Sequence, residues 1–188
     1  MWLWRKFYHL RQHMDLLQRN YFDLLAIPAQ FDIDLALLDQ HYRQLQTEVH
    51  PDRFVNASPN ERMQSMQVAT QVNAAYQTLK NMTARARYLL QLNEVDTLDE
   101  NNTVMPTEFL MQQMQWREVI EDANAHHDIA SLDALLNEVR SIAKSLALAL
   151  NTQFNLKTYL DASETVRKLS FIDKIISDIN HAIEMIEN

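Results

Sequence analysis

Residues 47–61 have the sequence TEVHPDRFVNASPNE, and this stretch decides the fold of the first half of the chain. Pro51 has a fixed φ and no backbone N–H, and it disfavours helical angles at the preceding residue, so a helix before it must end at about His50. Serine, proline and glutamate then follow one another with the spacing of a capping box, which predicts a second helix beginning just after Ser58. The stretch therefore predicts two helices joined by a short loop.

Apolar residues recur at helical spacing on both sides of this loop. The two predicted seams are Leu35, Leu38, Tyr42, Leu45 and Val49 before the loop, and Met66, Ala69, Val72, Tyr76 and Leu79 after it. Gaps that alternate between three and four residues place each set on one face of a helix. We therefore expect a helical hairpin whose loop holds His50, Pro51 and Asp52, with an imidazole and a carboxylate that no apolar core requires.

The composition of the chain excludes several classes of protein. The 188 residues include no glycine, which disfavours phosphate-cradling loops, dinucleotide folds and tight β-hairpins, and predicts an all-α protein. Without glycine, the helices are expected to end in left-handed caps at Asn81, Asn93 and Asn155. There is no cysteine, so disulfides, a thiol nucleophile and thiolate ligation of an iron–sulfur cluster are excluded.

Charge and hydropathy limit the partners. A net charge of −8 argues against nucleic-acid binding, which needs a basic footprint. No apolar run approaches the length that spans a membrane. We expect a soluble, cytoplasmic protein that needs no cofactor and no bound metal.

Four segments are predicted along the chain. Residues 1–19 mix aromatic and basic side chains, and they are either a membrane-surface or targeting segment or an extension upstream of a start at Met14. Residues 20–93 form the first domain, and the acidic, broken stretch 94–106 is the linker. Residues 107–188 hold three long amphipathic helices with short connections, which predicts an antiparallel three-helix bundle.

Some apolar residues of the bundle do not fit its core seams. In the first bundle helix the predicted core stripe is Phe109, Trp116, Val119 and Ile120, and in the last it is Val166, Leu169, Ile172, Ile176, Ile179, Ile183 and Ile186. Leu110 and Met114 lie four residues apart on another face, with Met111 beside them, and Phe171 with Ile175 lies off the last seam. Spacing alone leaves two interpretations, burial against the first domain or a partner surface.

Three sets of side chains suggest catalysis or metal binding: His50 with Asp52, His9 with His13, and the run His126, His127 and Asp128. Consecutive side chains on a helix point in different directions, so the last set has poor geometry for a metal. Two histidines without a third ligand are a weak metal signal. An interaction protein without an active site of its own is the favoured interpretation, and a helical hydrolase is the competing one.

Short motifs give the chain a family resemblance. The sequences NYFDLLAIP from Asn20, EVHPDRF, VNAAYQTLK and RARYLL resemble a J-domain, with His-Pro-Asp between its two long helices. In the second domain TEFLMQQMQWRE and ETVRKLSFIDKI look like the C-terminal bundle of the HscB family, J-proteins of bacterial iron–sulfur cluster assembly. The resemblance covers nearly all of residues 14–188.

The resemblance implies a function and two sets of site residues. J-proteins dock on a DnaK-type chaperone and stimulate its ATP hydrolysis, and this family delivers the scaffold protein on which an iron–sulfur cluster is built. The implied chaperone-binding residues are His50, Pro51, Asp52, Arg43 and Arg53. The implied scaffold-binding residues are Leu110, Met111, Met114, Glu118 and Phe171, which favours the partner surface over burial for the residues off the seams. The alternative is a J-protein with a different client.

Two departures from the family pattern affect charge. This chain has Gln115 where an acidic residue is usual and Ser170 where a basic one is usual, so charge steering towards the scaffold is expected to be weaker. Around the helix before the loop, the basic residues Arg43 and Arg53 are accompanied by the acidic Asp34, Asp39 and Glu48. We therefore expect chaperone docking to be less sensitive to salt than in other J-domains.

Overall fold

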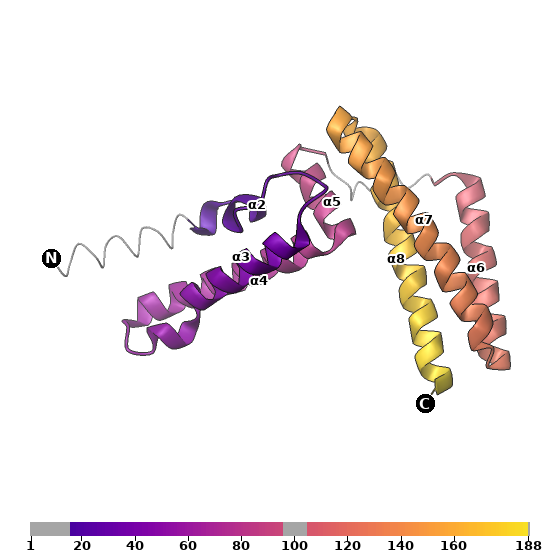
Figure 1. Ribbon diagram of the computed structural model, residues 1–188, viewed down its shortest axis with the longest axis horizontal. Coiled ribbons are helices and arrows are strands. Elements are labelled where there is room, and N and C mark those ends of the chain that lie inside the picture. The colour runs from indigo at the N-terminus through magenta and orange to yellow at the C-terminus, as the bar shows by residue number, and fades with distance from the viewer. Residues whose placement is uncertain (1–15, 96–104, 188) are drawn as a thin grey trace. The chain divides into compact units, whose positions relative to one another are not determined.

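A computed structural model describes residues 16–95 and 105–187, and this part of the chain is helical and contains no strand (Figure 1). The predicted all-α fold is confirmed. The basic aromatic segment before residue 16, with His9 and His13, and most of the predicted linker lie outside the described residues. The chain divides into two compact units between Leu89 and Leu90, and each is described by itself. Among the described helices, none is long and apolar enough to cross a membrane.

The first unit is built on a helical hairpin. Its elements are α2 (Tyr21–Leu24), α3 (Leu35–Val49), the 3₁₀-helix η1 (Pro51–Phe54), α4 (Pro59–Lys80) and α5 (Met82–Leu92), and α3 packs along α4 (Figure 1). The predicted capping box of Ser58 with Glu61 is complete, and Asp34 caps α3, its Oδ1 accepting from the backbone N–H of Ala36. Helix α2 is only four residues long, and the chain leaves it through Ala26, which takes a left-handed conformation with φ of 51°.

The seams of the hairpin differ from the apolar pattern at their ends. Leu38 and Val49 of α3 are buried as predicted, but Leu35 is 48% exposed. Val72 and Leu79 of α4 are also buried, whereas Met66 is 60% exposed. The position that α4 buries there is Ser65, whose hydroxyl bonds to α3, and a polar residue is missed by a search for apolar spacing.

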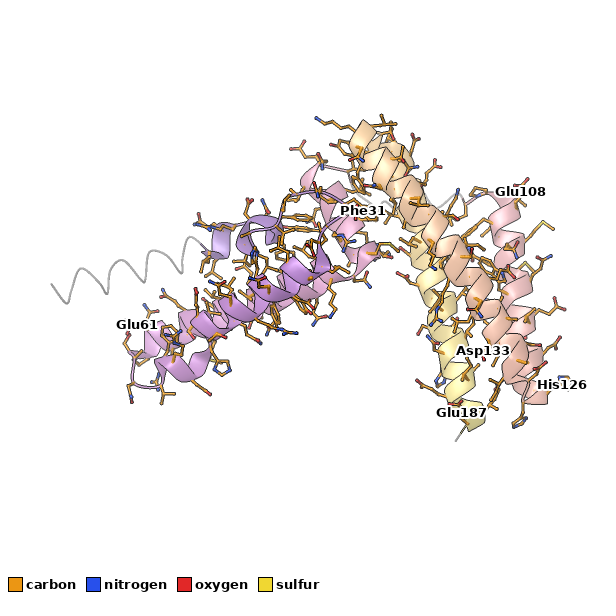
Figure 2. The ribbon with its side chains drawn as sticks, in the orientation of Figure 1. Phe31, Glu61, Glu108, His126, Asp133 and Glu187 are labelled. Atoms are coloured by element: carbon orange, nitrogen blue, oxygen red, sulfur yellow. The ribbon has the colours of Figure 1, made fainter. Side chains whose placement is uncertain are left out.

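A buried arginine ties the loop before α3 to the other helices of this unit. Arg85 Nε donates to the carbonyl of Phe31 at 2.8 Å, and its Nη1 donates to the carbonyl of Leu79. The guanidinium carbon also lies 5.4 Å from the centre of the Phe31 ring. Burial lowers the pKa of Arg85, and the two carbonyls and the ring compensate part of the cost of desolvating the charge. Figure 2 shows Phe31 at the end of this unit opposite Glu61.

The second unit is the predicted three-helix bundle. Its helices are α6 (Thr107–His126), α7 (Ile129–Leu156) and α8 (Tyr159–Glu187). They run antiparallel in sequence, because His126, Asp133 and Glu187 lie towards one end of the unit and Glu108 towards the other (Figure 2). The core is formed by Trp116, Leu132, Leu135, Leu136, Val139, Ile172, Ile175 and Ile179, with smaller residues between them.

Two predictions about the bundle core are wrong. Val119 was expected in the core stripe of α6 but is 39% exposed, and Ile175 was expected off the seam of α8 but is only 2% exposed. Val119 is exposed because the buried stripe of α6 passes through Gln113, Trp116 and Ala123. Ile175 is buried because α8 contacts both α6 and α7, so its buried face is wider than a single seam.

The helix ends also differ from the prediction. None of the three asparagines is a left-handed cap; within the described ranges the residues with positive φ are Ala26, Glu94, His127 and Lys157. Asn81 has φ of −79°, and its side chain accepts from the backbone N–H of Ala84 at the start of α5. His127 and Lys157 end α6 and α7 instead, with the bond from Thr158 N–H to the Gln153 carbonyl typical of a Schellman motif.

Glycine at one of these caps should stabilise the protein. Lys157 has φ of 58°, a conformation that costs a residue with a Cβ about 1 kcal/mol more than glycine. We expect Lys157→Gly to raise the free energy of unfolding of the bundle by about 1 kcal/mol, or the melting temperature by about 2–4 °C. Thermal melting followed by circular dichroism measures the change. Lys144→Gly, at an exposed position inside α7, is the control and should destabilise by a similar amount. A lower melting temperature for Lys157→Gly would contradict the prediction.

Candidate functional site

The His-Pro-Asp loop (residues 50–52) is an ordered turn rather than an irregular connection. His50 follows the last residue of α3 with φ of −59° and ψ of 130°, and Pro51 begins η1. The His50 Nδ1 atom accepts from the backbone N–H of Asp52 at 3.3 Å and lies 3.6 Å from the Asp52 Oδ2 atom. The side chains of His50 and Asp52 are 51% and 87% exposed, so both are available to a partner.

The loop is connected to the helices on either side. The backbone N–H of Arg53 donates to the His50 carbonyl at 3.0 Å, and Arg53 Nη1 donates to the Thr47 carbonyl at 3.3 Å. Arg53, predicted as a chaperone contact, therefore also satisfies a carbonyl in the last turn of α3. Arg43, the other predicted basic contact, is exposed on α3 two turns before His50.

A stacked tyrosine pair on α3 and α4 holds Lys80, a basic residue that the sequence patterns did not indicate as part of this face. The Tyr42 and Tyr76 rings stack with their centroids 3.9 Å apart. Tyr76 Oη donates to Asp39 Oδ1 at 2.8 Å and accepts from Lys80 Nζ at 2.8 Å. The hydrogen bond with Tyr76, followed by the charges of Tyr76 and Asp39, raises the pKa of Lys80, and the positive charge of Arg43 opposes this. The positive charge of Lys80 therefore offsets the negative charge of Asp39. Asp39 is one of the acidic residues for which weak positive charge was expected on this face.

The set His126, His127 and Asp128 does not form a metal site. His126 Nδ1 bonds to the carbonyl of Asp122 at 2.8 Å, and His127 is the left-handed cap of α6. Asp128 caps α7 by accepting from the Ser131 hydroxyl at 2.6 Å and from its N–H at 3.1 Å, and these bonds lower the pKa of Asp128. Within residues 16–95 and 105–187, no three histidine, aspartate or glutamate side chains converge as metal ligands would.

A second candidate site lies on the bundle. The apolar face of α6, defined here as Leu110, Met111 and Met114, is 45%, 58% and 70% exposed at these residues. Glu118 is exposed one turn further on. Long apolar side chains exposed together at helical spacing are typical of a partner surface. In the second unit taken by itself, these residues are therefore available for binding.

Phe171 joins this face from α8, but it is not fully exposed. It is half-buried, and its ring lies 6.4 Å from that of Phe109 in an edge-to-face arrangement. Phe109 immediately precedes Leu110 and also contacts Trp116 of the core, with centroids 6.3 Å apart. Phe171 is therefore both a neighbour of the α6 face and a support for the core. The Ser170 hydroxyl bonds to the Val166 carbonyl of its own helix at 2.8 Å, and Gln115 is exposed.

Two family models match the chain, and they divide it as the structure does. Residues 20–88 match the DnaJ domain, and residues 105–180 match the HSCB C-terminal oligomerisation domain. The first match contains the His-Pro-Asp loop and the hairpin around it. The second contains the α6 face and Phe171.

The match to curated relatives extends over most of the chain. The co-chaperone protein HscB homologue of Burkholderia multivorans is 46% identical over 171 residues, which is 91% of this chain and 98% of the relative. That of Paraburkholderia xenovorans is 45% identical over 93% of this chain and 100% of the relative.

Solved structures agree with this relationship. The chaperone HscB from Vibrio cholerae has a TM-score of 0.80 and 36% identity, and the match covers 89% of this chain and 99% of the solved one. The human co-chaperone protein HscB has a TM-score of 0.79 and 29% identity, over 87% of this chain and 82% of the solved one. Sequence and structure thus place the likeness over both units.

Proposed function

The chain belongs to the HscB family of J-domain co-chaperones, and on that premise we propose that its partners are an HscA-like chaperone and an IscU-like scaffold protein. As a member of this family it is not an enzyme; it regulates the ATPase of an Hsp70-type chaperone in iron–sulfur cluster assembly. The finer proposal is supported by one observation. Each unit presents exposed side chains that its own packing does not require, His50 and Asp52 on the first and the α6 face on the second.

In this proposal the chaperone docks on the first unit. His50, Pro51 and Asp52 contact it at the loop, and Arg43 and Arg53 contact it from either side. Because η1 and the end of α3 already fix the backbone of the loop, little conformational entropy is lost when the partner binds. Lys80, whose Nζ donates to Tyr76 Oη on α4, adds positive charge to the first unit, which moderates the deficit of basic residues expected there.

The scaffold protein binds the second unit in this proposal. Leu110, Met111 and Met114 supply apolar contact, Phe171 supplies an aromatic edge, and Glu118 supplies a charge at the rim. Methionine side chains adapt to irregular partner surfaces, which suits a client that must be released again. With Gln115 and Ser170 in place of charged residues, apolar contact rather than charge steering accounts for most of the affinity.

Measurement of ATP hydrolysis tests the first half of the proposal. The chain alone should hydrolyse no ATP, an HscA-like chaperone alone should hydrolyse it slowly, and the mixture should be faster. Adding an IscU-like scaffold protein should lower the concentration of chain needed for half-maximal stimulation. A mixture no faster than the chaperone alone would contradict the proposal.

Capture of the client tests the second half and addresses the alternative of a different client. The immobilised chain should retain purified scaffold protein, and an unrelated J-protein without this bundle should not. If the chain stimulates the chaperone but does not retain the scaffold, it acts on another client.

Removing residues 1–13 should leave both activities intact. Contacts between the N-terminal residues and the helical hairpin are present from Leu17 onwards, because Gln71 Nε2 of α4 donates to the Leu17 carbonyl at 3.2 Å. The truncated chain should match the full chain in chaperone stimulation, in scaffold titration and in melting temperature. Weaker binding to either partner would show that the basic aromatic segment contributes to function.

A further inference from the structure

The end of α3, just before the His-Pro-Asp loop, requires a special arrangement of hydrogen bonds. The last carbonyls of a helix have no partner within the helix, and they are commonly satisfied by a left-handed glycine cap. Pro51 has no N–H to donate, and the chain has no glycine. Side chains take over this role, because Arg53 Nη1 donates to the Thr47 carbonyl and Ser65 Oγ donates to the Val49 carbonyl at 3.1 Å.

Ser65 differs from the threonines of these two helices in where its hydroxyl donates. Thr47 and Thr70 donate to the carbonyl four residues earlier in their own helices, as helical threonines commonly do. Ser65 instead donates from α4 to a different helix, α3, sixteen residues away in sequence. It is fully buried, and Val49 is only 2% exposed, so the bond is shielded from water.

This bond acts directly on the peptide unit that leads into His50. The Val49 carbonyl and the His50 N–H belong to one planar group, so holding the carbonyl fixes the direction in which His50 leaves the helix. The His50 imidazole is then oriented by its own bond from the Asp52 N–H. The two bonds together determine the orientation of the imidazole, one through the backbone and the other through the side chain.

We propose that Ser65 is a positioning residue for chaperone stimulation, whose hydroxyl holds the Val49–His50 peptide so that His50 and Asp52 face the chaperone in one orientation. The proposal rests on the function proposed above. Without the hydroxyl, the loop occupies several orientations, and a docked chaperone meets the productive one for only part of the time. Contacts made by Arg43 and Arg53 are unchanged, so docking itself persists.

The test compares Ser65→Ala with the parent chain in an ATPase titration against an HscA-like chaperone. We expect the maximal stimulation to fall by roughly threefold or more, while the half-saturating concentration changes by less than about twofold. Amide hydrogen exchange at residues 50–53 should become faster than in the parent. Thr70→Ala removes a hydroxyl from the same helix without affecting α3, so it should leave both measurements unchanged.

A second variant separates the hydrogen bond from packing. Ser65→Cys keeps the size of the side chain but has only a weak donor. We expect Ser65→Cys to melt close to the parent and to stimulate the chaperone as poorly as Ser65→Ala. If the alanine variant unfolds, the cysteine variant alone tests whether the hydrogen bond is needed for stimulation. Full stimulation by either folded variant, or an equal loss in Thr70→Ala, would overturn the proposal for Ser65. If the parent chain itself fails to stimulate the chaperone, the proposed function is wrong instead.

Discussion

Replacing His50 with glutamine should reduce stimulation of the chaperone's ATP hydrolysis by at least about tenfold while leaving the fold intact. The imidazole is half-exposed, and the contacts described for it are with Asp52 of the same turn, so the core loses no packing. Substitutions at such surface positions usually change the free energy of unfolding by less than about 0.5 kcal/mol. The measurement is an ATPase titration with an HscA-like chaperone, with melting followed by circular dichroism.

The control for this substitution is His181→Gln, the same change at an exposed position of α8 in the other unit. It should stimulate as the parent does. Equal stimulation by His50→Gln and the parent would show that the loop is not the chaperone site. A large fall in melting temperature would show that His50 supports the fold.

The second large effect is expected on the bundle. Replacing Leu110, Met114 and Phe171 together with alanine should weaken scaffold binding by about tenfold or more, since each truncated contact at an interface centre commonly costs about 1–4 kcal/mol. Stimulation of the chaperone without scaffold should persist, because the loop is unchanged. Calorimetric titration with the scaffold protein and the scaffold-free ATPase assay measure the two results.

Phe171 requires a separate variant because of its contact with Phe109. The double variant Leu110→Ala and Met114→Ala changes two side chains that are 45% and 70% exposed, so it should melt close to the parent. Adding Phe171→Ala should lower stability by about 1–2 kcal/mol, because a half-buried ring that packs against another is lost. The matched control is Leu148→Ala with Met185→Ala, whose side chains are 72% and 64% exposed on the other two helices, and it should bind the scaffold normally. If the first double variant binds as tightly as the parent, the α6 face is not the scaffold site.

Much of the fold could be predicted because local signals agreed with one another. The proline after His50 and the capping box at Ser58 each fix a helix end through contacts within a few residues. Such contacts can be inferred from spacing alone. The same holds for the exposed α6 face, since Leu110 and Met114 lie off the core stripe of their own helix.

The predictions that failed depended on contacts between distant residues. Ser65 is buried because its hydroxyl has a partner on α3, and Arg85 is buried because Phe31 and Leu79 offer carbonyls. Polar residues of this kind are invisible to a search for apolar spacing. The left-handed caps at His127 and Lys157 could not be predicted either, because neither residue favours that conformation and the geometry of the turn imposes it.

The connection between α7 and α8 has a consequence for how quickly the bundle forms. Only Lys157 and Thr158 separate the two helices, so the loop that must close in the unfolded chain is very short and its entropic cost is small. Pairing can begin at this turn and extend outward along both helices, with each new contact joining residues only slightly further apart in sequence. Helical proteins dominated by such local contacts fold in microseconds to milliseconds. His127 and Asp128 join α6 to α7 by an equally short turn, so both hairpins of the bundle should form by local pairing and the three helices should assemble quickly.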